Sequence, residues 1–87
     1  MKLKKGLNLC SMGDEYVVVA EKPEVFSGMI KLNKTGAFLF EQLTEKITLS
    51  ELKNRLTNKY EVSPQTAEED IKSFVETFVK AGLMENE

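Results

Sequence analysis

The chain has 87 residues, of which 41% are hydrophobic and 30% are charged, and its net charge is −2. This balance is typical of one folded domain spanning residues 1–87, and the small net charge defines no surface for a polyanion or a polycation. There is no histidine, and Cys10 is the single cysteine. These counts argue against an internal disulfide, a zinc site and a histidine-based catalytic centre, so we predict no metal and no cofactor.

No run of about 18 apolar residues is present, so the sequence predicts no membrane span. The basic N-terminus is followed by an apolar run that is too short and too broken for a signal peptide. We therefore expect a cytoplasmic location.

The first third of the chain predicts three strands. Residues 7–12 and 16–20 form two of them, and the turn residues Gly13–Glu15 predict a hairpin between them. Pro23 excludes a helix in the connection that follows. Alternating apolar residues then predict a third strand over residues 26–32.

The apolar spacing changes at Asn33 from two residues to three and four. An asparagine side chain can accept from the free amides of a first helical turn, so Asn33 predicts a helix cap directly after the strand. The helix is expected over residues 34–45 and to be central, because apolar side chains lie on several of its sides. Its apolar face would carry Gly36, Leu39, Phe40, Leu43 and Ile47.

Two further helices have clear start signals. Thr48 and Glu51 match a capping box, which predicts a second helix to about Lys59. Ser63 followed by Pro64 predicts the start of a third helix, which would run over residues 64–81 and stop at Gly82. The second helix is expected to bury Leu49, Leu52, Leu56 and Tyr60, and Leu83 and Met84 are expected to fold back over the core.

The third helix has a core face with two unequal flanks. The core face carries Ala67, Ile71, Phe74 and Phe78, one flank carries Glu68, Lys72, Val75 and Val79, and the other carries Glu69, Ser73, Thr77 and Lys80. Two interpretations stay open. The two valines belong to a wide core face that is fully covered, or they line a shallow groove rimmed by Lys72.

The third strand is an edge strand if the sheet is a simple meander. Residues 26–32 contain one charge, Lys31, and no proline, so this edge carries little protection against pairing with another chain. A weakly protected edge beside an apolar helix flank is a geometry that suits the addition of an extended peptide as a further strand.

Three segments together resemble the PqqD-like family. They are "LNKTGAFLFEQL" at residues 32–43, "TLSELKNRLTNKYEVS" at residues 48–63, and a pattern formed by Ala67, Asp70, Ile71, Phe74, Gly82 and Leu83. The resemblance covers about residues 3–84. Phe40 departs from it, because many members carry tryptophan there.

The resemblance implies an α+β, winged-helix-like fold with a three-stranded antiparallel sheet followed by three helices. It also implies a RiPP recognition element, a non-catalytic protein that holds the leader of a ribosomally made precursor peptide for a radical SAM enzyme or a leader peptidase. In the family, the leader adds beside the third strand and packs against the third helix. Carried over, the peptide-binding residues would be Gly28, Met29, Ile30, Lys31, Leu32, Lys72, Val75 and Val79.

Three other functions are alternatives for a chain with this sequence. A winged-helix DNA-binding role conflicts with the consecutive acids at residues 68–70, so nucleic acid is not the expected partner. Independent catalysis is disfavoured because adjacent helical carboxylates point about 100° apart and do not converge. A structural or dimerisation module that pairs through the third strand remains an alternative.

Overall fold

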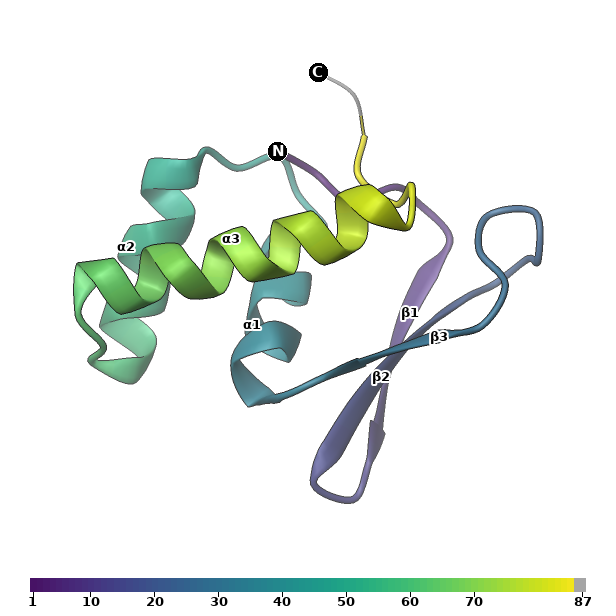
Figure 1. Cartoon of the computed structure of the whole chain (residues 1–87), viewed down its shortest axis with the longest axis horizontal. Coiled ribbons are helices and arrows are strands. Elements are labelled where there is room, and N and C mark those ends of the chain that lie inside the picture. The colour runs from purple at the N-terminus through teal and green to yellow at the C-terminus, as the bar shows by residue number, and fades with distance from the viewer. Residues whose placement is uncertain (86–87) are drawn as a thin grey trace.

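Three strands followed by three helices build the structure, a computed structural model that describes residues 1–85 (Figure 1). The elements are β1 (Leu7–Met12), β2 (Glu15–Ala20), β3 (Met29–Leu32), α1 (Lys34–Gln42), α2 (Leu49–Tyr60) and α3 (Pro64–Lys80). Helix α1 packs against β2 and β3, and the three helices pack against one another. The fold is α+β with an open sheet in a winged-helix-like arrangement, as expected.

The sheet is antiparallel with the order β1-β2-β3, so β1 and β3 are its edges. Val18 of β2 lies opposite Ile30 of β3 and faces the core with no exposed surface. The β1–β2 turn is shorter than predicted, because Glu15 pairs with Met12 as the first residue of β2. The predicted meander is confirmed, including the edge position of β3.

Strand β3 is shorter than the predicted strand over residues 26–32. Gly28 has a φ of +117°, outside the extended region, so the strand begins only at Met29. Phe26 is half-buried against the core instead of continuing the strand. Within β3 the predicted alternation holds, since Met29 and Lys31 are exposed while Ile30 and Leu32 are half-buried.

Helix α1 begins as predicted and ends early. The Asn33 side chain accepts a hydrogen bond from the Gly36 amide at 2.8 Å, which confirms the cap. The prediction that this helix extends to residue 45 is wrong, because the N-terminal segment forms backbone hydrogen bonds with the chain after Gln42. The Leu3 amide donates to the Leu43 carbonyl at 2.8 Å.

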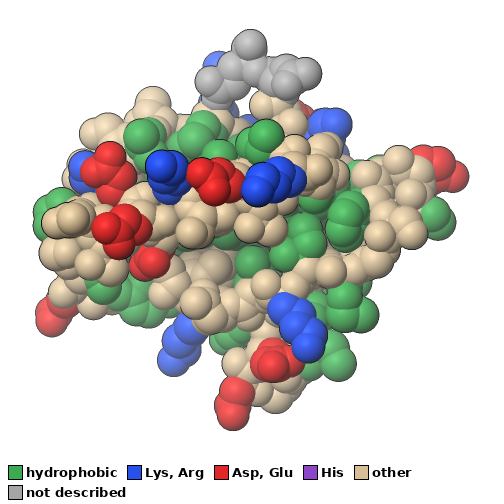
Figure 2. Space-filling model, viewed as in Figure 1, with side chains coloured by type: hydrophobic (Ala, Val, Ile, Leu, Met, Phe, Trp, Pro, Cys, Tyr) green, Lys and Arg blue, Asp and Glu red, His purple; other side chains and the backbone are tan. Residues whose placement is uncertain are grey.

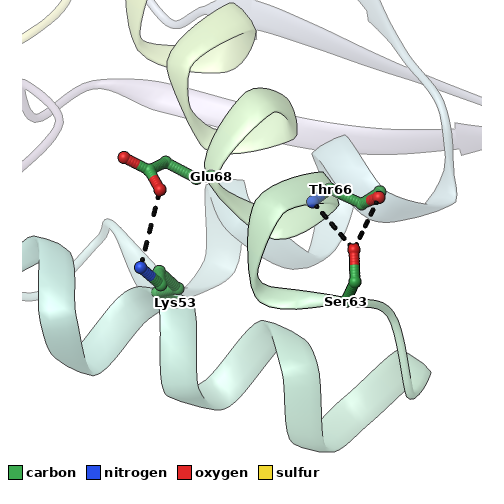
Figure 3. A network of polar contacts seen from close by, with 4 residues as sticks. All are labelled: Lys53, Ser63, Thr66 and Glu68. Atoms are coloured by element: carbon green, nitrogen blue, oxygen red, sulfur yellow. Dashed lines mark hydrogen bonds and ion pairs between the residues drawn. The ribbon is translucent and has the colours of Figure 1, made fainter.

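The other two helices match their predicted starts. Thr48 accepts from the Glu51 amide at 3.1 Å, and Ser63 accepts from the Thr66 amide at 3.1 Å (Figure 3). Helix α3 ends one residue early at Lys80, and Gly82 follows with a φ of +73°, in the left-handed region that suits a helix stop.

Burial follows the sequence pattern with one exception in α2. Leu52 and Leu56 are fully buried and Tyr60 is half-buried, but Leu49 is 49% exposed at the first helical position. Leu83 is buried and Met84 packs against the core, as predicted. No helix within residues 1–85 is both long and apolar enough to cross a membrane.

Candidate functional site

The outer edge of β3 is open. Strand β3 pairs with β2 on one side, and in the part of the chain that the structure describes no strand pairs with its other side. The edge carries one charge, Lys31, which is exposed. An edge strand of this kind presents unpaired amides and carbonyls to a second polypeptide.

A groove lies beside this edge, between β3, the first turn of α1 and one flank of α3. Its volume is about 330 Å³. Its apolar lining comes from Leu32, Leu39 and Phe74, and its polar lining comes from Lys31, Asn33, Thr35, Asp70, Ser73 and Thr77. In Figure 2, hydrophobic side chains are visible in the recess between α3 and the sheet. The groove and the strand edge therefore form one continuous surface.

The first turn of α1 lies close to β3 where both line the groove. Gly36 also lines the groove, and a Cβ atom at this position would lie 3.2 Å from two atoms of the Leu32 side chain. Glycine at this position therefore lets the helix begin tight against the strand that it follows. Because Asn33 caps the same turn, the sequence from Leu32 to Gly36 sets the position of this turn against the strand.

Some of the predicted strand residues lie at this site and others do not. Lys31 and Leu32 line the groove, and Met29 is 58% exposed at the start of the edge. Ile30 is half-buried and faces the core opposite Val18. Gly28 lies before the strand, so it is next to the edge and not part of it.

The predicted helix residues Lys72, Val75 and Val79 do not line this groove. They belong to the flank of α3 that carries Glu68, whose carboxylate lies 3.6 Å from the Lys53 Nζ of α2 (Figure 3). Val79 is 56% exposed, so the interpretation as a fully covered core face does not hold for it, and Val75 is half-buried against the core. The structure thus turns the polar flank of α3, with Ser73 and Thr77, toward β3.

Sequence reasoning missed this flank for a physical reason. Helical periodicity places one flank on each side of the core face, and nothing in the helix itself says which of them borders the sheet. Ser73 and Thr77 carried no signal beyond being polar. Asp70 belongs to the pattern that resembles the PqqD-like family, whereas Ser73 and Thr77 do not.

The chemistry that the groove offers is recognition. Its lining supplies aliphatic and aromatic surface, hydroxyl groups, one carboxylate and one ammonium group. Residues 1–85 contain no group of three histidine, cysteine, aspartate or glutamate side chains placed to hold a metal ion. Together with the open β3 edge, the lining suits an extended peptide that forms a backbone ladder and places side chains in the groove.

Two solved structures share this fold. One is described as "TbiB1 in Complex with the TbiA(beta) Leader Peptide"; it is 21% identical, has a TM-score of 0.77, and the match covers 100% of this chain and 98% of that one. The other is described as "Lasso peptide synthetase B1 complexed with the leader peptide"; it is 22% identical, has a TM-score of 0.71, and the match covers 94% and 93%. No curated protein matches in sequence.

A protein family matches most of the chain. The family is described as "Coenzyme PQQ synthesis protein D (PqqD)", and the match spans residues 15–84, from the first residue of β2 to the segment after α3. The matched span contains β3, all three helices and every residue that lines the groove. The chain belongs to this PqqD family.

Proposed function

We propose that this protein binds the leader segment of a ribosomally made precursor peptide as a fourth strand along β3 and presents it to a separate modifying enzyme. The observation that carries the proposal is the open edge of Met29–Leu32 bordered by the groove under α3. The family and the two similar structures, both described as leader-peptide complexes, support it.

The energetics require both the edge and the groove. Ordering a flexible peptide costs roughly 1–2 kcal/mol per residue, and each new backbone hydrogen bond returns a net of about 0.5–1.5 kcal/mol. The net free energy of forming the backbone ladder alone is therefore close to zero. Each well-buried side chain adds about 1.5–3 kcal/mol, so a few anchors give micromolar binding, which is about −8 kcal/mol. Leu39 and Phe74 provide the apolar floor for one such anchor.

The rest of the proposal concerns the partners. A radical SAM enzyme or a leader peptidase carries out the chemistry, and this chain, acting as one domain over residues 1–87 in the cytoplasm, contributes binding alone. The family and the recognition chemistry of the groove support this division of labour.

The test uses a panel of synthetic leader peptides from ribosomally made precursors, and the one that the wild type binds most tightly serves as the ligand. A Thr77→Trp substitution places a bulky side chain in the groove from an exposed helix position. We expect leader affinity, measured by isothermal titration calorimetry, to fall by a factor of 50 or more, which is about 2.3 kcal/mol. Unchanged affinity would place the leader elsewhere.

Val79→Trp is the matched control, because Val79 is exposed on the other flank of the same helix. We expect its affinity to stay within a factor of about two of the wild type. If Val79→Trp abolishes binding and Thr77→Trp does not, the peptide lies along Lys72, Val75 and Val79 instead.

A further inference from the structure

Asp70 is the one carboxylate in the lining of the groove. Its side chain belongs to a half-buried residue, and within residues 1–85 it forms no hydrogen bond or ion pair. Glu68, on the opposite flank of the same helix, has Lys53 as its partner. The groove therefore holds a carboxylate whose hydrogen-bonding capacity is still directed to water.

A peptide seated in the groove would remove part of that water. Burying a charged carboxylate without a partner is costly, whereas a cation brought by the ligand restores the lost interactions. The Thr77 hydroxyl in the same lining is already engaged, because it donates to the Ser73 carbonyl at 3.0 Å. An occupant that carries its own cationic donor for Asp70 would therefore bind better than one that does not.

Lys31, the cation in the same lining, comes from the strand, and no ion pair joins it to Asp70 within residues 1–85. Lys31 lies opposite Val17, and Ile30 lies opposite Val18 on the core face, so the Lys31 side chain starts from the outer face of the sheet. A peptide strand beside β3 alternates in the same way. Its residues that face α3 meet Asp70 and Phe74, and the residues between them face outward with Lys31.

The spacing along α3 sets the spacing in the peptide. Asp70 and Phe74 are four residues apart, about 6 Å along a helix axis. Two residues of a strand span about 6.6 Å and place both side chains on one face. We propose that Asp70 selects a lysine or arginine in the leader, two residues from the apolar side chain that packs over Leu39 and Phe74. This inference rests on the proposed function.

A purely structural role for Asp70 has to be separated from this. Thr35 and Gly36 of the first turn of α1 line the same groove, and α1 has no acidic residue in its first turn. A nearby carboxylate stabilises a helix N-terminus. Asp70→Asn would then lower the melting temperature without changing which peptides bind.

The experiment pans a display library of random twelve-residue peptides against the wild type, Asp70→Lys and the control Glu69→Lys. Glu69 is exposed and does not line the groove, so the control makes the same charge change on the same helix. We expect the wild type and the control to enrich lysine or arginine two residues from an apolar residue, and Asp70→Lys to enrich aspartate or glutamate there. Identical selections by the wild type and Asp70→Lys would overturn the inference.

The selected peptide and its lysine-to-glutamate version give the quantitative test by fluorescence polarisation. We expect the glutamate version to bind the wild type about fivefold more weakly and to bind Asp70→Lys more tightly, as for a partly screened ion pair. Equal binding of both versions, with a lower melting temperature for Asp70→Asn, would assign Asp70 to α1 and overturn the inference.

The two proposals fail in different ways. Peptides that bind Thr77→Trp as well as the wild type would refute the groove itself. Peptides that lose binding to Thr77→Trp but show no charge preference would refute only the role of Asp70.

Discussion

The two flanks of α3 differ in composition and in surroundings. The more apolar flank lies toward another helix, and the more polar flank lies toward the open strand edge. The flank toward α2 carries Val75 and the exposed Val79, and it has an ion pair to the neighbouring helix. The flank toward β3 is polar, yet it borders the open edge and the groove. The apolar composition of a flank therefore does not indicate which side of this helix borders the open strand edge.

Phe74 stands at the boundary between the two flanks, and its loss is expected to have the largest effect. It is 6% exposed, stacks on Phe78 with ring centroids 4.4 Å apart, and forms part of the groove floor. Phe74→Ala should lower the free energy of unfolding by about 3–5 kcal/mol in urea denaturation. Val79→Ala should change it by less than about 0.5 kcal/mol. Similar losses for both would show that the valine flank is as well packed as the core.

Val75→Asp tests directly whether the valine flank of α3 contributes to leader binding. Val75 is half-buried against the core, so a charge there should lower the free energy of unfolding by about 1–2 kcal/mol. Because Val75 does not line the groove, leader affinity at a temperature where the variant is folded should stay within about twofold of the wild type. A tenfold or larger loss of affinity, with an unchanged circular dichroism spectrum, would return the binding site to this flank.

Asn33→Ala tests how much the helix cap beside β3 contributes to stability. Removing the side chain that accepts from the Gly36 amide should cost about 1 kcal/mol in thermal or urea unfolding. Asn33→Asp, which keeps the accepting oxygen, should recover most of that loss. If alanine costs nothing, the cap does not hold the first turn of α1 against the strand.

The ion pair between Lys53 and Glu68 should have the smallest effect. The two side chains are 36% and 62% exposed, and the N–O distance is 3.6 Å. A double-mutant cycle should give a coupling of less than about 0.5 kcal/mol, and it should vanish in 1 M salt. A coupling above 1 kcal/mol would mean that contacts on this flank hold α3 against α2 more firmly than its exposure indicates.

The element order and the helix starts could be predicted from the sequence because their signals are local. The side chains of Asn33, Thr48 and Ser63 act within three residues of their own position, and Gly82 suits a left-handed stop wherever the helix packs. Strand β2 and hairpin pairing follow equally local patterns. These signals fixed the fold class and the position of β3 at the edge.

The errors have two kinds of cause, which are contacts with distant segments and a local backbone angle. The end of α1 depends on Leu3, which lies forty residues earlier in the chain. The Leu3 amide donates a hydrogen bond to the Leu43 carbonyl. The start of β3 depends on the φ of Gly28, which spacing does not reveal. The orientation of α3 is set by its packing on α1 and α2, so the groove residues Asp70, Ser73 and Thr77 could not be assigned before the helices were placed.

The N-terminal segment has a consequence for how the protein can be joined to others. Leu3 bridges Met84, and the Glu85 amide donates to the Lys2 carbonyl at 2.8 Å, so the beginning of the chain and its last described residues run side by side. In Figure 1 they lie across α3 from β3. A second protein fused to either end would leave the strand edge clear. A short flexible linker would hold that protein near this domain at an effective concentration in the millimolar range.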